Sequence, residues 1–151
     1  MTTRMRAHSS ASARALLIAT VVCTIATAGC WGSSPRGGSG DVRVTDIILG
    51  RSLAPDGTIA EDGRTNSFWV NDTFYVEVVT EGAAPSATLA AHWTYQDGTA
   101  AGEATKTISP SGATTTVLQA SNPELWKPGD YKVEVLLDGV SAGTKELSAR
   151  G

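Results

Sequence analysis

Apolar and polar residues alternate along most of the chain from Asp41 to Gly151. A period of two, in runs rich in valine, threonine and aromatic residues, is typical of β-strands, because successive side chains of a strand point to opposite faces. Turn residues, such as Asp97-Gly98 and Asp138-Gly139, separate the runs. We therefore expect strands at residues 42–49, 73–80, 88–96, 103–109, 113–120, 130–139 and, last, near 143–148.

About seven strands in one domain's worth of residues predict an all-β fold built from two sheets. A single sheet would leave an apolar face uncovered, whereas two sheets packed face to face bury both. One short helical turn is expected between the fifth and sixth strands, at residues 121–129. Ser121 or Asn122 suits the cap of such a turn, Pro123 its first position and Gly129 its end.

Two features of these strands resemble immunoglobulin-like and fibronectin type III-like domains. Trp93 lies in the third strand, where such domains often bury a tryptophan, and "WKPGDY" looks like their tyrosine corner, with Tyr131 as the corner residue. Val133 stands where antibody domains have their second cysteine, so the resemblance implies a sandwich without a disulfide. The chain is also similar to domains of bacterial exported proteins that carry no assigned chemistry, which implies a fold more than a function.

Residues 1–29 have the pattern of a secretory signal peptide. Arg4, Arg6 and Arg14 are their only charged side chains, and an apolar segment follows from Ala15 to Ala28. As a helix, this segment would be about 21 Å long, which is short of the ~30 Å hydrocarbon core of a membrane. We therefore expect a signal segment rather than a transmembrane helix.

The end of this segment, Thr27 to Cys30, resembles the lipobox of bacterial lipoproteins. In that family the cysteine receives a diacylglyceryl group and becomes the mature N-terminus, although a leucine usually stands where this chain has Thr27. Cys23 would be removed with the signal, which leaves Cys30 as the single mature cysteine. Lipidation explains an unpaired thiol in an oxidising compartment. Ordinary secretion is the alternative, because Ala26-Thr27-Ala28 also fits a signal peptidase site.

Residues 30–40, "CWGSSPRGGSG", are expected to form a lipidated cysteine and a flexible linker to a domain at 41–151. All fifteen acidic residues follow Cys30 and three of the twelve basic ones precede it, so the mature chain carries nine positive and fifteen negative charges, a net −6. This balance argues against binding to nucleic acid or to anionic lipid headgroups. Membrane attachment would therefore come from the lipid itself.

His92 is the only histidine after the signal segment. A serine nucleophile would need it as a base, together with an acid to orient it, and "AAHWT" lacks the Gly-x-Ser-x-Gly setting of the hydrolases. The phase of its strand places His92 on the solvent face. We therefore expect no enzyme, no cofactor and no metal site, with a secreted or envelope hydrolase as an alternative.

The long segment 50–72 contains four acidic residues of the type that ligates calcium. They are Asp56, Glu61, Asp62 and Asp72. Their spacing fits no EF-hand loop, and a solvated connection with turns at Asp56-Gly57 and Asp62-Gly63 explains them equally. A connection of this length is expected to contain a short strand or to be a functional loop.

Exposed aromatic residues are the candidates for a binding surface. Phe68 and Trp69 are adjacent, so in one strand they face opposite sides. Trp69, Tyr75 and Trp126 are candidates to stack on sugar rings or to anchor a protein, unless they pack in the core. The sequence thus predicts a lipoprotein on the outer side of a bacterial membrane with a non-catalytic binding or structural module, whose partner is an envelope protein or a polysaccharide. A carbohydrate- or calcium-binding module is the further alternative.

Overall fold

The computed structural model describes residues 41–151. The predicted signal segment, the linker and Cys30 lie outside the described residues. Within this range the chain forms eight strands and one short 3₁₀ turn. They are β1 (Arg43–Gly50), η1 (Glu61–Gly63), β2 (Ser67–Trp69), β3 (Phe74–Glu81), β4 (Ala87–Tyr95), β5 (Ala100–Ile108), β6 (Thr114–Ala120), β7 (Gly129–Leu137) and β8 (Val140–Arg150).

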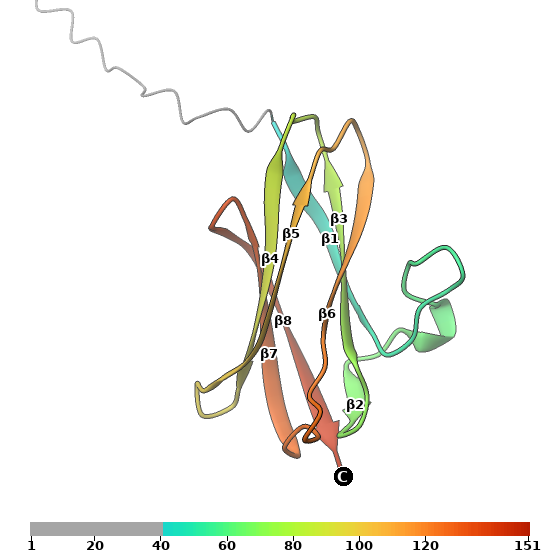
Figure 1. Ribbon diagram of the computed structural model, residues 1–151, viewed down its shortest axis with the longest axis vertical. Coiled ribbons are helices and arrows are strands. Elements are labelled where there is room, and N and C mark those ends of the chain that lie inside the picture. Colours follow the sequence, from blue (N-terminus) through green and yellow to red (C-terminus); the bar gives the residue numbers. More distant parts are fainter. Residues whose placement is uncertain (1–40) are drawn as a thin grey trace, which may run out of the picture. The chain divides into compact units, whose positions relative to one another are not determined.

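The strands form two sheets that pack face to face (Figure 1). One sheet has three strands in the order β1-β3-β6, and the other has five in the order β2-β8-β7-β4-β5. All neighbouring pairs are antiparallel except β2 and β8, which run parallel. The predicted all-β sandwich of two sheets is confirmed.

The core consists of the inward-facing side chains of both sheets. Alternate residues of β3, β4 and β7 are buried, in agreement with the period of two in their sequences. The largest buried side chains include Trp93, Phe68, Phe74 and Leu89. Trp93 has no exposed surface, so the prediction that it is a core residue is confirmed.

The predicted tyrosine corner is present. The hydroxyl of Tyr131 donates a hydrogen bond of 2.9 Å to the carbonyl of Lys127, four residues upstream. The predicted helical turn just before it is wrong. The side chain of Asn122 does accept a hydrogen bond from the amide of Glu124, but Leu125 has a φ of 68°, a left-handed conformation that cannot continue a helix.

β2 is the strand that the period of two did not predict. It has three residues and lies in the long connection after β1, where a short strand was one of two expectations. β5 and β8 also begin earlier than predicted, because both hairpins close through short turns and their ladders continue almost to the turn. The first turn has three residues, Gln96-Asp97-Gly98, and only Gly98 has a positive φ; the second has two, Asp138-Gly139, and both have a positive φ.

The connection between β1 and β2 is held against β3 by a buried carboxylate. Glu77 lies on the outer face of the three-stranded sheet, and its Oε2 accepts a hydrogen bond of 2.6 Å from the amide of Ile59. Both residues are buried. Gly50 is required beside them, because a Cβ at this position would lie 2.3 Å from the Cγ2 of Ile59.

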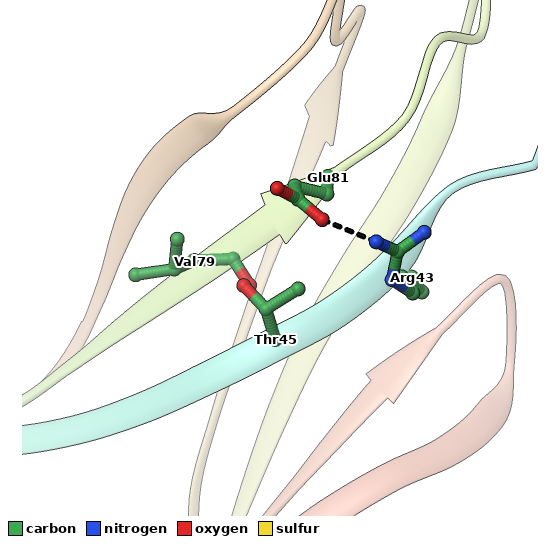
Figure 2. A network of polar contacts seen from close by, with 4 residues as sticks. All are labelled: Arg43, Thr45, Val79 and Glu81. Carbon is green, nitrogen blue, oxygen red and sulfur yellow. Dashed lines mark hydrogen bonds and ion pairs between the residues drawn. The ribbon is translucent and has the colours of Figure 1, made fainter.

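Two side-chain interactions join the beginning of β1 to β3. Arg43 forms an exposed ion pair with Glu81, and the hydroxyl of Thr45 donates a hydrogen bond of 3.2 Å to the carbonyl of Val79 (Figure 2). The register shifts at Thr45, so this residue is the extra residue of a β-bulge. β1 begins at one end of the sandwich and β2 lies at the opposite end (Figure 1).

Within residues 41–151, the structure has no helix that is long and apolar enough to cross a membrane.

Candidate binding surface

The outer face of the five-stranded sheet is covered with polar side chains. Residues that alternate with the buried ones point to this face, and cross-strand partners lie side by side on it. We call it the outer face, and its central side chains are Ser67, Trp69, Thr144, Glu146, Ser148, Arg150, Asp130, Lys132, Glu134, Thr94, His92 and Glu103.

A depression of about 560 Å³ lies on this face at the end of the sandwich near β2. Its volume falls within the range of about 300–1,000 Å³ that is usual for small-molecule sites. We call it the polar depression, and it is lined by Asn66, Thr94, Tyr95, Gln96, Gly98, Asp130, Tyr131, Lys132, Glu146, Leu147 and Ser148.

The wall of the polar depression is held by a chain of hydrogen bonds around Gln96. Its Oε1 accepts from the amide of Asp130 at 3.2 Å, and its Nε2 donates to the hydroxyl of Tyr95 at 3.1 Å. That hydroxyl in turn donates to the carbonyl of Pro128 at 2.9 Å. Gly129 leaves room for this ring, because a Cβ there would lie 2.7 Å from the hydroxyl oxygen of Tyr95. The wall is therefore built before any ligand arrives.

Four polar side chains of the depression remain available. Within residues 41–151, no hydrogen bond or ion pair engages the side chains of Asn66, Asp130, Lys132 or Glu146. Lys132 lies directly opposite Glu146 in the pairing of β7 with β8, and Asp130 lies opposite Ser148. Donors and acceptors thus converge on one small area without satisfying one another.

Two ionisable groups next to the depression have shifted pKa values. Burial raises the pKa of Tyr131 above its ordinary value. The hydroxyl and the amide of Thr99 lower the pKa of Asp97, which accepts a hydrogen bond from that amide at 2.8 Å. Asp97 therefore stays ionised in the turn that borders Gly98.

Trp69 lies on the outer face beside the depression and has 53% of its surface exposed. Phe68 is only 1% exposed, so the prediction that these neighbours face opposite sides is confirmed. The amide of Trp69 donates to the carboxylate of Asp72 at 2.8 Å, which orders the turn after β2. Ser67 pairs with Ser148 on the depression, so Trp69 lies two residues along the same strand face, roughly 7 Å away.

Trp126, a candidate for the binding surface, packs in the core, which was the alternative left open for it. Trp126 is 3% exposed, stacks on Phe74 and donates from Nε1 to the carbonyl of Asp72 at 2.8 Å. Tyr75 is partly buried in β3, which belongs to the other sheet. The three predicted aromatic residues therefore do not form one surface, and Trp69 alone remains a well-exposed candidate.

Leu125 is an exposed residue that sequence reasoning missed. It has 53% of its surface exposed and a left-handed backbone that is rare for leucine. Its neighbour Trp126 donates an amide hydrogen bond to the carbonyl of Val70, next to Trp69, so Leu125 and Trp69 lie at the same end of the sandwich. An apolar residue inside the turn-forming stretch "SNPELWKPG" was the available signal.

His92 of β4 lies beside Glu103 of β5. Its side chain lies on the outer face, as predicted, with Nε2 3.8 Å from Oε1 of Glu103. No hydroxyl within residues 41–151 is hydrogen-bonded to it.

Two of the four acidic residues of segment 50–72, Asp56 and Asp72, stabilise turns through their side chains, and Glu61 and Asp62 lie in the 3₁₀ turn η1. Asp56 accepts hydrogen bonds from the amide and the hydroxyl of Thr58, and these lower its pKa. Asp72 accepts from Trp69. Across residues 41–151, no three His, Cys, Asp or Glu side chains are grouped to hold a metal ion.

Comparison with known proteins supports the fold. The C-terminal domain of wzt superposes with a TM-score of 0.50 and 14% identity, over 76% of this chain and 76% of that one. An immunoglobulin-like protein from Pseudomonas aeruginosa superposes with a TM-score of 0.47 and 14% identity, over 76% of this chain and 100% of that one. By its two sheets, its core tryptophan and its tyrosine corner, the domain at residues 41–151 has an immunoglobulin-like β-sandwich fold. The domain also matches part of an alkylpurine DNA glycosylase from Pseudomonas fluorescens, with a TM-score of 0.46, 14% identity and 74% of this chain covered, but it spans only 31% of that protein.

No protein-family model and no curated protein matches the chain. At these identities the likeness to solved structures shows the fold alone. The features that bear on function are therefore those of the outer face, namely the polar depression and Trp69.

Proposed function

We propose that the chain is an exported lipoprotein, anchored through Cys30 to the outer side of a bacterial membrane. Its immunoglobulin-like domain then acts as a non-catalytic module that binds a protein or a polysaccharide of the cell envelope. The lipobox-like residues Thr27 to Cys30 and the lack of a second mature cysteine support the anchor.

The exposed indole of Trp69 is the observation that carries the binding role. Tryptophan is enriched among the few residues that carry most of the binding energy of an interface, and Trp69 has 53% of its surface exposed. β2, which carries Trp69, lies at the end of the sandwich opposite to the start of β1 (Figure 1). A domain tethered at Asp41 would therefore present Trp69 on the side away from its anchor.

A non-catalytic role agrees with the chemistry around the single mature histidine. His92 has a carboxylate neighbour, Glu103, but no hydrogen-bonded hydroxyl within residues 41–151. Acyl transfer by a serine needs all three groups in one arrangement. An activity of the purified protein on envelope material that collapses in His92→Ala would overturn this part of the proposal.

The anchor is tested by labelling growing cells with palmitate. The wild-type chain and Cys23→Ser should both carry the label, because residue 23 belongs to the predicted signal segment, and Cys30→Ser should lose it. The two serine variants differ only in which cysteine is removed, so a general defect in export would affect both. An unlabelled mature protein that begins at Gly29 would show plain secretion instead.

The binding role is tested by capture from envelope extracts on immobilised domain, residues 41–151. All strands and the whole described core lie in this range, so the fragment contains what it needs to fold. Trp69→Ala should lose the captured material. Val140→Ala is the matched control, because Val140 is also exposed but is the first residue of β8, whereas β2 pairs with the last three residues of that strand. Equal loss in both variants would contradict a site at Trp69.

A further inference from the structure

We infer that the polar depression and Trp69 together bind a neutral oligosaccharide. This inference rests on the proposed function and names the ligand class of the same surface. It follows from the kinds of group that converge there, from their charges and from the length of the surface.

The free side chains of the depression match the hydrogen bonding of sugars. Each sugar hydroxyl both donates and accepts, so a saccharide site needs both kinds of group within reach. The ammonium of Lys132 donates, the carboxylates of Asp130 and Glu146 accept, and the amide of Asn66 does both. A purely anionic or purely cationic ligand would use only part of this set.

The charges of the depression favour an uncharged ligand. Lys132 lies opposite Glu146 on the neighbouring strand and two residues from Asp130 on its own. Arg150, which pairs with Trp69, adds a second positive charge, so the whole surface carries two positive and two negative side chains and favours neither an anion nor a cation. A neutral polyol bonds to groups of either sign without adding a charge.

Trp69 supplies the apolar contact that sugar rings require. One face of a pyranose ring carries C–H groups, which pack on an exposed aromatic ring. Trp69 pairs with Arg150, and the depression extends along β8 to Glu146. The four residue steps from Glu146 to Arg150 correspond to about 13 Å, which exceeds the width of one sugar ring. The surface therefore fits an oligosaccharide rather than a single sugar.

Rigidity of the wall lowers the cost of binding. The hydrogen bonds that join Gln96 to Asp130 and to Tyr95 hold this part of the depression in place. A site that is ordered beforehand loses less conformational entropy when the ligand arrives.

The test is a titration of the fragment 41–151 with three probes: N-acetylchitotetraose, cellotetraose and, as the charged counterpart, tetragalacturonate. Trp69 is the one exposed tryptophan in this range, because Trp93 and Trp126 are buried. Stacking of a sugar ring should therefore change the indole fluorescence of Trp69 and protect it from acrylamide. Calorimetry on the same samples gives affinities that do not depend on that signal.

At least one neutral probe should bind, and tetragalacturonate should bind more weakly. Trp69→Ala and Lys132→Ala should each weaken binding by about tenfold or more, since each removes a group that the ligand contacts. Glu103→Gln is the control, because Glu103 lies on the same face outside the depression, and it should leave the affinity unchanged. Thermal unfolding of each variant shows that the fold is intact.

Three outcomes would overturn the inference: no binding of either neutral probe at millimolar concentration, tighter binding of tetragalacturonate, or binding that neither Trp69→Ala nor Lys132→Ala weakens. The proposed function is tested separately by envelope capture. Capture of a protein that depends on Trp69 and Leu125, with no affinity for the neutral sugars, would keep the binding module and reject the saccharide.

Discussion

The indole ring of Trp126 lies flat on the ring of Phe74, with centroids 4.2 Å apart and planes 10° from parallel. Phe68 and Tyr131 contact Phe74 from other sides, at 4.7 and 5.5 Å between centroids. This aromatic cluster fills the end of the sandwich beneath the exposed Trp69. The candidate surface therefore lies next to a cluster of four aromatic rings in the core.

The two buried tryptophans should respond differently to replacement by phenylalanine. Trp126 Nε1 donates to the carbonyl of Asp72, whereas Trp93 Nε1 is buried without a hydrogen-bond partner within residues 41–151. We expect Trp126→Phe to cost about 1 kcal/mol more than the loss of ring volume alone, and Trp93→Phe to lack this penalty. Urea denaturation of both variants measures the difference, and equal losses would mean that the Asp72 bond contributes nothing.

Phe68 and Trp69 form a matched pair within one strand. Phe68→Ala should lower the free energy of unfolding by about 3–5 kcal/mol, because it opens a cavity in the aromatic cluster. Trp69→Ala should change it by no more than about 0.5 kcal/mol, since the backbone bond to Asp72 does not depend on the side chain. Chemical denaturation checks both values. A large loss at Trp69 would assign it to the core and remove it from the proposed surface.

Tyr131 should make the domain sensitive to alkaline pH. Burial raises the pKa of its hydroxyl in the folded state, so the unfolded chain loses this proton first as the pH rises. The stabilisation is fully present below the unfolded value of about 10 and is lost as the pH rises from there through the higher folded value. Tyr131→Phe should cost about 1 kcal/mol at neutral pH, through loss of the bond to Lys127, and should flatten the alkaline decline. Unfolding midpoints between pH 7 and pH 11 would show this, and an unchanged decline in the variant would assign it to other groups.

Glu77 should hold the connection between β1 and β2 in place. Glu77→Ala leaves the buried amide of Ile59 without an acceptor, which should cost about 1–3 kcal/mol. Glu77→Gln keeps a carbonyl oxygen in the same position and should retain most of the stability. Hydrogen exchange at Ile59 gives a local measurement: the amide should exchange faster in the alanine variant. Equal exchange in the two variants would mean that packing alone holds the segment.

Most of the fold was predictable because strand periodicity is a local signal. The inward positions of Trp93 and Val133 follow from alternation within β4 and β7, and the tyrosine corner is contained in a few consecutive residues. The position and the pairing of β2 were not predictable, because three residues carry no period and its pairing with Ser148–Arg150 joins distant parts of the chain. The burial of Trp126 depends in the same way on Phe74 in another strand.

The polar depression had no sequence signal at all. Asn66 precedes β2, Asp130 and Lys132 come from β7, and Glu146 comes from β8. Each of these residues looks like an ordinary polar position in its own part of the chain. Only the pairings of β8 with β7 and with β2 bring them together, so sequence reasoning identified Trp69 but not the polar groups beside it.

The attachment of β1 has a mechanical consequence. β1 pairs with β3 from Arg43 to Gly50, and the hydrogen bonds of an antiparallel pair are perpendicular to the strands. Tension applied at Asp41 and directed along β1 would load these bonds together, in shear, rather than opening them one at a time. The Arg43–Glu81 ion pair and the Thr45 bulge lie at the loaded end (Figure 2). A domain pulled between a tether at its first strand and a ligand near β2 would therefore resist force along its strongest direction.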